Sequence, residues 1–404
     1  MDTLAQEGAW TMQRAGVGAL RRGTIRTMAA AGAALSVVLG TMVLALPATA
    51  HTQPTYHVRE VISGKSLHHW YTRAGSRTKH REPLTQPDDI TAIGGKLFTG
   101  FQNGVGPQGE PSTDGNRDST VVEFTPNGRV IRQWDIQGKC DGLTADPYTG
   151  QVIATVNEDL HSSLYSIGPG SGRLTHYRYS RPLPHHGGTD AITFYRGMML
   201  ISASAPGTTG AAAPNPAYPA VYSVTLNQAR HKAFVRPLFY DESAATAANG
   251  PRFTKTVRLR LTDPDSSEVV PPMAPRFAGD FMLTSQGDLE QIFVHRAGTR
   301  AQHLSVLRLS RSVDDTAWAT AWHGAFYATD HGADHVDVIS GTFWPGTALV
   351  AVTPCNANSA PATCPGPGFP ANYLGQLNMY TGQITRVRLR GASLEPQGLI
   401  FAAR

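Results

Sequence analysis

The chain has 404 residues, with 35 Lys and Arg against 30 Asp and Glu and a formal net charge of +5. So small a surplus supports no nucleic-acid partner, and the sequence contains neither the Gly-x-x-x-x-Gly-Lys-Ser/Thr phosphate loop nor a Gly-x-Ser-x-Gly nucleophile motif. We therefore expect neither nucleic-acid binding nor a serine triad, and no organic cofactor is evident.

Residues 1–50 have the pattern of an export signal. Four arginines precede an apolar run over residues 28–46, and the small residues Ala48 and Ala50 frame a cleavage site. A single membrane-spanning helix is the alternative, since about 20 apolar residues cross a bilayer, but this run is rich in Ala and Gly and ends in a proline. We predict cleavage after Ala50, by the Sec or the twin-arginine route, and a secreted protein (extracellular or cell-wall associated) without a membrane span.

Residues 51–404 consist of short alternating runs of Val, Ile, Thr, Tyr and Phe between Gly, Asn and Pro turns, which is typical of an all-β fold. A polar residue followed two positions later by an apolar one recurs, and several intervals are close to the about 40–50 residues of a propeller blade. The polar residue is Asp88, Asp141, Asp190, Ser267, Thr316 and Gln397 in turn.

These repeats predict a single β-propeller domain with four-stranded antiparallel blades. The count is six or seven, because the last interval has room for one enlarged blade or two compact ones. Residues 205–220 and 241–251 are interpreted as loop insertions. We expect the ring to close by pairing a strand near residues 399–403 with one near residues 56–62.

Two kinds of turn alternate along the chain. Tight turns rich in glycine include Gly94-Gly95, Arg196-Gly197 and, as the first hairpin of a later blade, His323-Gly324. Polar loops occupy residues 102–103, 157–161, 286–290 and 330–335. Because antiparallel strands alternate in direction, the polar loops and the strand starts are predicted to gather on one face, around the channel mouth.

Three cysteines remain in an exported chain. Cys355 and Cys364 stand at the two ends of a loop rich in Asn, Ala and Pro, and we predict a disulfide between them. Cys140, at the start of a strand, is interpreted as a small buried apolar residue.

Two segments resemble known propeller families. The stretch Asp-Gly-Leu-Thr-Ala-Asp from Asp141 resembles the blade start of SMP-30/gluconolactonase-like propellers, and residues 156–167 resemble YVTN and NHL repeats. The first resemblance implies that Asp141 binds a divalent metal in the channel and helps to move a proton. That family also supplies a Glu and an Asn ligand from other inner strands, and neither is reproduced at the corresponding positions here.

Asp88, Asp141 and Asp190 would place three carboxylates near one channel mouth, where they repel one another unless a cation or shared protons offset the charge. Ca²⁺ or another divalent cation, held by these three residues, is the predicted partner. The alternative is that each Asp accepts backbone N–H groups and holds a link between blades.

Asp141 is also the first catalytic candidate, with His186 or His331 as acid or base. Solvated loop histidines are the alternative interpretation. The polar loops supply the ligand-binding candidates, which are Asn157, Glu158, His161, His185, Gln286, Asp330, Asp334 and His335.

Two functions remain open. One is a monomeric exported hydrolase of lactonase type, or a lyase, that acts on a small molecule or sugar derivative with metal assistance. The other is a non-catalytic propeller that binds a glycan, a peptide or a protein.

Overall fold

A computed structural model describes residues 54–73, 75–184, 188–204, 218–354 and 371–403. Regular structure there consists of strands and of short 3-10 turns such as η1 (Gly64–Ser66) and η4 (Gln228–Arg230), which confirms the all-β prediction. Within these ranges no helix has the length and apolar character needed to cross a membrane. The export signal predicted for residues 1–50 lies outside the described residues and stays a prediction.

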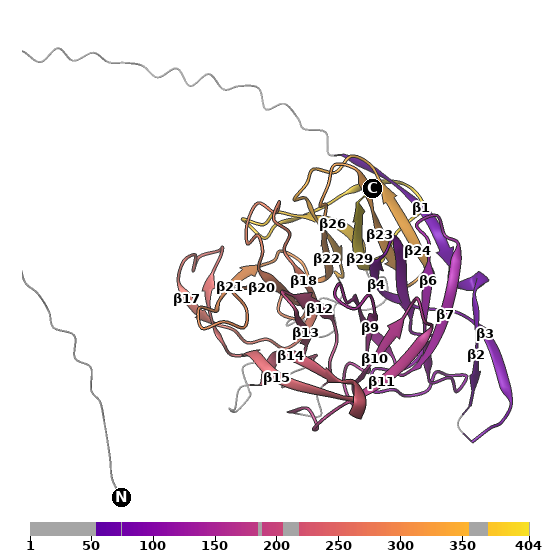
Figure 1. Cartoon of the computed structure of the whole chain (residues 1–404). Helices are drawn as coiled ribbons and strands as arrows, with labels where there is room; N and C mark the ends of the chain where they lie inside the picture. Colours follow the sequence, from indigo (N-terminus) through magenta and orange to yellow (C-terminus); the bar gives the residue numbers. More distant parts are fainter. Residues whose placement is uncertain (1–53, 74, 185–187, 205–217, 355–370, 404) are drawn as a thin grey trace, which may run out of the picture. The chain divides into compact units, whose positions relative to one another are not determined.

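The strands of the described residues form six blades, numbered here by their innermost strands (Figure 1). The first blade is β4 (Pro87–Ile93), β5 (Lys96–Phe101), β6 (Asp118–Phe124) and β7 (Val130–Gln137). The second is β8 (Cys140–Ala145), β9 (Val152–Val156), β10 (Ser163–Gly168) and β11 (Arg173–Tyr179). The third is β12 (Ile192–Tyr195), β13 (Met198–Ser202), β14 (Pro219–Asn227) and β15 (Lys232–Tyr240).

The fourth blade is β18 (Pro264–Val269), β19 (Phe281–Ser285), β20 (Glu290–His295) and β21 (His303–Arg308), widened by β16 (Ala244–Ala247) and β17 (Thr256–Arg258). The fifth is β22 (Val313–Trp318), β25 (Ala348–Val352), β26 (Tyr373–Leu377) and β27 (Ile384–Arg386). The sixth is β29 (Pro396–Ala403), β23 (Gly324–Asp330), β24 (His335–Ser340) and β1 (Thr55–Ser63), widened by β28 (Arg388–Gly391). A separate hairpin pairs β2 (His68–Thr72) with β3 (Lys79–Pro83).

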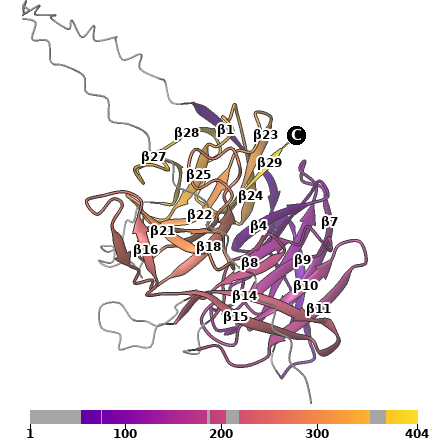
Figure 2. The same cartoon turned by 60° about the vertical axis from the view of Figure 1, so that its left-hand side comes forward.

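The innermost strands form a closed circle. Each of β4, β8, β12, β18, β22 and β29 contacts the next, and β29 contacts β4. The second and third blades are also joined at their outer edges, where β11 runs parallel to β15 (Figure 2). The predicted β-propeller is therefore confirmed, and the described residues make six blades rather than seven.

The fifth and sixth blades are interleaved in the sequence, which the repeat pattern did not predict. β22 pairs with β25, whereas β23 pairs with β24 and with the C-terminal β29. The turn at His323-Gly324 therefore leads from one blade to the next, and its prediction as a hairpin within one blade was wrong. Residues 241–251, expected to be a loop insertion, include β16, which pairs with β21.

The ring closes within the sixth blade, but the predicted strand pairing was also wrong. β1 pairs with β24 and β29 pairs with β23, so two strands lie between the N-terminal and C-terminal strands. The innermost strand of this blade, β29, comes from the C-terminal end of the described chain, and β1, which lies between β24 and β28, comes from its N-terminal end. Both ends of the described chain are therefore tied into one sheet.

Buried apolar side chains fill the space between the blades. Six clusters occur among the described residues, one at each of the six blade interfaces. At the first interface, Phe98 and Val121 pack with Val152 and Ala154 of the second blade. Each fully buried Phe or Val side chain stabilises the fold by about 2 kcal/mol relative to an exposed one. The buried, free Cys140 belongs to the same cluster, as predicted.

Candidate functional site

The innermost strands share an irregular start. In β4 the register shifts between Pro87 and Ile90, and in β8 it shifts between Cys140 and Leu143. The same two-residue bulge occurs in β18, β22 and β29, and in the third blade Asp190 takes the corresponding place just before β12. The first bulged residue is thus equivalent in all six blades and is Asp88, Asp141, Asp190, Asp265, Asp314 and Gln397.

The predicted strand starts were correct in four blades and wrong in two. Asp265 and Asp314 hold the places that we had given to Ser267 and Thr316, two residues further on. A slip of two residues leaves every side chain on the same face of the strand, so the alternation of apolar and polar residues does not reveal it. The ring of equivalent positions therefore contains five aspartates, not three.

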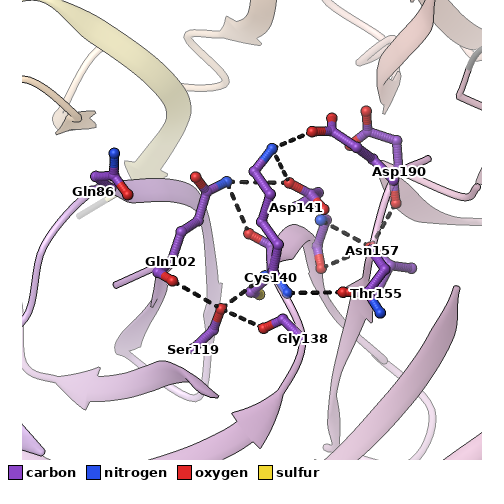
Figure 3. Close-up of polar contacts among 12 residues, drawn as sticks. Gln86, Gln102, Ser119, Gly138, Cys140, Asp141, Thr155, Asn157 and Asp190 are labelled. Carbon is purple, nitrogen blue, oxygen red and sulfur yellow. Dashed lines mark hydrogen bonds and ion pairs between the residues drawn. The ribbon is translucent and has the colours of Figure 1, made fainter. Parts of the chain in front are cut away.

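Glycine allows two bulges to lie against a neighbouring blade. A Cβ atom on Gly142 would lie 2.4 Å from the carbonyl oxygen of Asp190, and one on Gly398 would lie 2.4 Å from that of Asp88. Thr155 completes the first of these contacts, since its hydroxyl donates to the Asp190 carbonyl at 2.6 Å (Figure 3). At these two interfaces the backbone of one blade thereby fixes where the next blade presents its aspartate.

These aspartates line a cavity of about 450 Å³ at the channel mouth, which we call the channel cavity. Its lining includes ten carboxyl groups and, among the described residues, a single lysine, Lys139. The carboxyl groups belong to Asp88, Asp89, Asp141, Glu158, Asp190, Asp263, Asp265, Glu268, Asp314 and Asp315.

Burial and mutual repulsion change how these acids ionise. Burial raises the pKa of Asp141 to about 8, in spite of the opposing effect of Lys139. The pKa of Asp88 is also well above its usual range, first through burial and then through the charge of Asp141. For Asp190 the causes are burial and the charge of Glu158. The channel cavity therefore retains protons near neutral pH unless a cation replaces them.

Lys139 connects two of the predicted site residues. Its Nζ lies 2.8 Å from Oδ1 of Asp141 and also pairs with Oε1 of Glu158. Burial alone would lower the pKa of Lys139, but the charges of Asp141 and Glu158 outweigh it and raise the pKa. Gln102 donates from Nε2 to the same Oδ1 at 3.1 Å (Figure 3). Sequence reasoning missed Lys139, although it stands two residues before Asp141.

The two aspartates missing from the prediction form a pair. The carboxyl groups of Asp265 and Asp314 are hydrogen-bonded to each other, so one of them carries a proton. Burial is the main cause that raises the pKa of Asp314 to about 7. Gln286, a predicted ligand-binding residue, donates from Nε2 to Oδ1 of Asp314 at 2.7 Å and lines the channel cavity.

We had considered that the ring aspartates accept backbone N–H groups and link the blades. In two blades the next residue along the chain does this instead. Asp89 accepts the N–H of Ile90 and, through its other oxygen, the N–H of Leu143 in the next blade, each at 2.6 Å. Asp315 bridges the fifth and sixth blades in the same way, with Thr316 and Leu399 as donors. Both members of each tandem pair thus line the channel cavity, and the second also joins two blades through backbone N–H groups.

A second group of ionisable residues lies in the sixth blade, outside the channel cavity. Nε2 of His335 is 3.1 Å from Oδ2 of Asp337 and 3.6 Å from Oδ2 of Asp330. Hydrogen bonds that His335 donates to the carboxylates of Asp330 and Asp337 raise its pKa to about 10, which makes it a cation. In the described ranges this is the one set of three such residues whose ligating atoms lie within 4.8 Å of one another.

The remaining predicted residues take several places. Asn157 accepts the backbone N–H of Lys139 at 3.0 Å, His161 is exposed, and Asp334 accepts the backbone N–H of Gln86. Burial lowers the pKa of His331, and Lys139 lowers it further, so His331 is neutral at pH 7. The predictions for His185, His186, Cys355 and Cys364 fall outside the described residues.

A divalent cation fits the chemistry of the channel cavity, since buried carboxylate and amide oxygens are the ligands that Ca²⁺ prefers. The side chains of Asp88, Asp141 and Asp190 do not form one of the compact sets of three found in the described part of the chain. Direct binding of one ion by all three aspartates therefore stays a prediction, and bound water would have to complete the coordination of an ion held by fewer of them.

Comparisons with known proteins found no matching family model and no curated protein of similar sequence. The periplasmic gluconolactonase of Pseudomonas aeruginosa is a similar solved structure, with 14% identity, 86% of this chain and 99% of that chain covered, and a TM-score of 0.42. A protein of unknown function from Bacteroides caccae has 10% identity over 83% and 98% of the chains and a TM-score of 0.41. The Cps50 (Swd1) propeller domain of Myceliophteria thermophila has 11% identity over 76% and 85% and a TM-score of 0.37.

A gluconolactonase is thus among the structural neighbours, but no sequence family supports the SMP-30 or NHL resemblance. Likenesses this distant say nothing of activity or site residues. The assignment as a β-propeller rests on the closed circle of six innermost strands.

Proposed function

We propose that this protein is an exported hydrolase of lactonase type whose channel cavity binds a small polar molecule or sugar derivative. The observation that carries the proposal is the convergence of five equivalent aspartates on one cavity together with Lys139. Buried acids with pKa values near neutral are suited to proton transfer at physiological pH. Export from the cell is part of the proposal and depends on the predicted signal in residues 1–50.

The residues of the cavity can account for both proton transfers in the hydrolysis of a lactone. Asp141 has a pKa of about 8, so its carboxylate is the minor form at pH 7, and it is this form that takes a proton from water while the water oxygen forms a bond to the acyl carbon. The ring C–O bond then breaks, and the departing alkoxide oxygen takes the proton held by the Asp265–Asp314 pair. Protonated Asp141 and the deprotonated pair return to their starting states by exchange with solvent. His331, neutral at pH 7, was the other predicted base, but it is not among the residues that line the channel cavity.

A divalent cation bound among the cavity carboxylates would polarise the substrate carbonyl. In its absence, Lys139 and Gln102 are the donors placed beside Asp141. Because Lys139 already neutralises part of the charge at Asp141, the chain carries a cation of its own at the predicted metal position. This observation favours the second candidate function, a propeller that binds a glycan, a peptide or a protein without turnover.

The test is hydrolysis of aldonolactones by the purified protein, followed by proton release before and after chelation and re-addition of Ca²⁺, Mg²⁺, Mn²⁺ or Zn²⁺. We expect turnover, reduced by about 100-fold or more in Asp141→Asn and in Asp314→Asn, since general acid–base catalysis contributes that much. Asp114→Asn, at an exposed residue outside the cavity, is the matched control.

Two results would overturn the proposal. If Asp141→Asn hydrolysed lactones at the wild-type rate, the proposed reaction in the channel cavity would be wrong. The protein would instead be a binding propeller if a sugar derivative stabilised it but no lactone was hydrolysed with any of the added metal ions.

A further inference from the structure

A second cavity, of about 720 Å³, lies beside the second blade, and we call it the arginine cavity. Residues of four segments line it: the loop between β5 and β6, the end of β7 with Gly138, the β9–β10 loop with the first residues of β10, and β11 with the residues after it. The loop at residues 157–162 also borders the channel cavity, because Glu158 lines one cavity while Asn157 and His161 line the other.

The arginine cavity is basic. Arg117, Arg178 and Arg181 line it together with His161 and His176, and no Asp or Glu is among its lining residues. In the part of the chain that the structure describes, none of the three arginines has a carboxylate oxygen within 4.0 Å. Guanidinium groups cannot lose their charge in this pH range, so three that share a cavity without an acid favour an anion there.

The charge of Arg178 acts on neighbouring side chains of the cavity. Burial lowers the pKa of His176, and Arg178 lowers it further, so His176 is neutral at pH 7. Nε2 of His176 lies 2.8 Å from the hydroxyl of Ser163. Arg117 is held in place by a hydrogen bond from Nη1 to the carbonyl of Gly109 at 3.1 Å.

Uncharged groups provide the rest of the lining. Tyr165 and His176 stack with their ring centroids 4.3 Å apart, and Tyr179 contributes a further ring. Leu160 and Leu183 add apolar surface. Amide and hydroxyl groups stand between these apolar parts, from Gln108, Gln137, Asn157, Ser162, Ser163 and Ser180.

We propose that the arginine cavity binds an anionic saccharide, a short chain of sugars that carries carboxylate or sulfate groups. Arginine forks bind such groups with two parallel hydrogen bonds. The amides and hydroxyls match sugar hydroxyl groups, and aromatic rings with leucines match the apolar faces of sugar rings. A cavity of this size lies within the range of about 300–1,000 Å³ that is usual for ligand sites.

The test uses calorimetric titration of the full chain with trigalacturonate, a sulfated chondroitin disaccharide, maltotriose as the neutral control, and inorganic phosphate. We expect one or both acidic saccharides to bind more tightly than maltotriose and phosphate, and to bind more weakly as salt is added. Trigalacturonate and the chondroitin disaccharide separate a carboxylate site from one that also accepts sulfate.

The double variant Arg178→Gln/Arg181→Gln should weaken this binding at least about tenfold, because it removes two charge-assisted partners. Arg173→Gln is the matched control, as Arg173 is an exposed residue of the same strand, β11, outside the cavity lining. Asp141→Asn should leave the affinity unchanged, which distinguishes this cavity from the channel cavity and from the proposed hydrolase.

Three results would overturn the proposal: no binding of either acidic saccharide, equal binding of maltotriose or phosphate, or undiminished binding by the double variant. If Arg173→Gln lost as much affinity for the acidic saccharide as the double variant, general positive charge and not this cavity would attract the anion. Thermal unfolding of each variant confirms that it is folded before titration.

Discussion

The channel cavity and the arginine cavity are neighbours with opposite charge. Ten carboxyl groups and one lysine line the first, whereas three arginines, two histidines and no acid line the second. The loop at residues 157–162 borders both. The chain thus separates its charges in space. Its net charge of +5 does not reveal that two adjacent cavities carry opposite charge.

The two cavities should respond to different solutes, because each lacks enough groups of the opposite charge to balance its own. Buried acids close together are stabilised by protons, by Lys139 or by an added cation, so the channel cavity should respond to pH and to metals. Arginines keep their charge at every accessible pH, so the arginine cavity should respond to anions and to salt.

The largest expected effect is that of Lys139→Met. The change leaves Asp141 and Glu158 without their cation, and removing one partner of a buried pair costs about 3 kcal/mol in the free energy of unfolding. Urea denaturation at pH 7.5 measures it. At pH 5 the loss should shrink, because the acids can take up protons instead.

Arg178→Met in the arginine cavity is the counterpart of this change. Arg178 is exposed and has no ion pair with a described residue, so its replacement should alter stability by less than about 0.5 kcal/mol. An equal loss in the two variants would contradict the contrast between the cavities.

The next largest effect is the pH dependence of the wild-type protein's free energy of unfolding. The pKa values of Asp141, Asp314 and Asp315 are raised to about 8, about 7 and about 6. Between the unfolded value near 4 and these values, the folded state binds more protons than the unfolded state, so stability falls as pH rises. His335, with its pKa raised to about 10, adds to the fall above about pH 6.5.

We expect the melting temperature in a chelating buffer to drop by about 3 °C from pH 5 to pH 8, which corresponds to about 2 kcal/mol for a domain of this size. Calorimetry at both pH values measures the drop, and Ca²⁺ should reduce it at pH 8. A melting temperature that rises over this range would show that the cavity acids ionise normally. Asp314→Asn should flatten the curve.

Apart from the Arg178 control, the smallest predicted change in the free energy of unfolding distinguishes the two members of one tandem pair, Asp88 and Asp89. Asp88 is repelled by Asp141, so Asp88→Asn should raise the free energy of unfolding by about 1 kcal/mol. Asp89 accepts two backbone N–H groups, and an amide nitrogen cannot accept, so Asp89→Asn should lower it by about 1 kcal/mol. Urea denaturation compares the two, and a change of the same sign in both would mean that they share one role.

Sequence reasoning reached the blades and their faces, because turn residues and alternation are local signals. It placed Asp88, Asp141 and Asp190 at strand starts and Gln286 on the same face. It missed Asp265 and Asp314, since a slip of two residues preserves alternation. It also missed Lys139, whose partners Asp141 and Glu158 meet only when β8 and β9 pair.

The order of residues by itself determined an all-β chain, repeated blade starts and the direction of most strands, because each follows from neighbours a few positions apart. Only the tertiary structure decided the number of blades, the interleaving of the last two, the ring of five aspartates and the separation of acidic from basic cavities. These features depend on pairings between residues far apart in the chain, such as β1 with β24 and β29 with β23, and no local pattern encodes them.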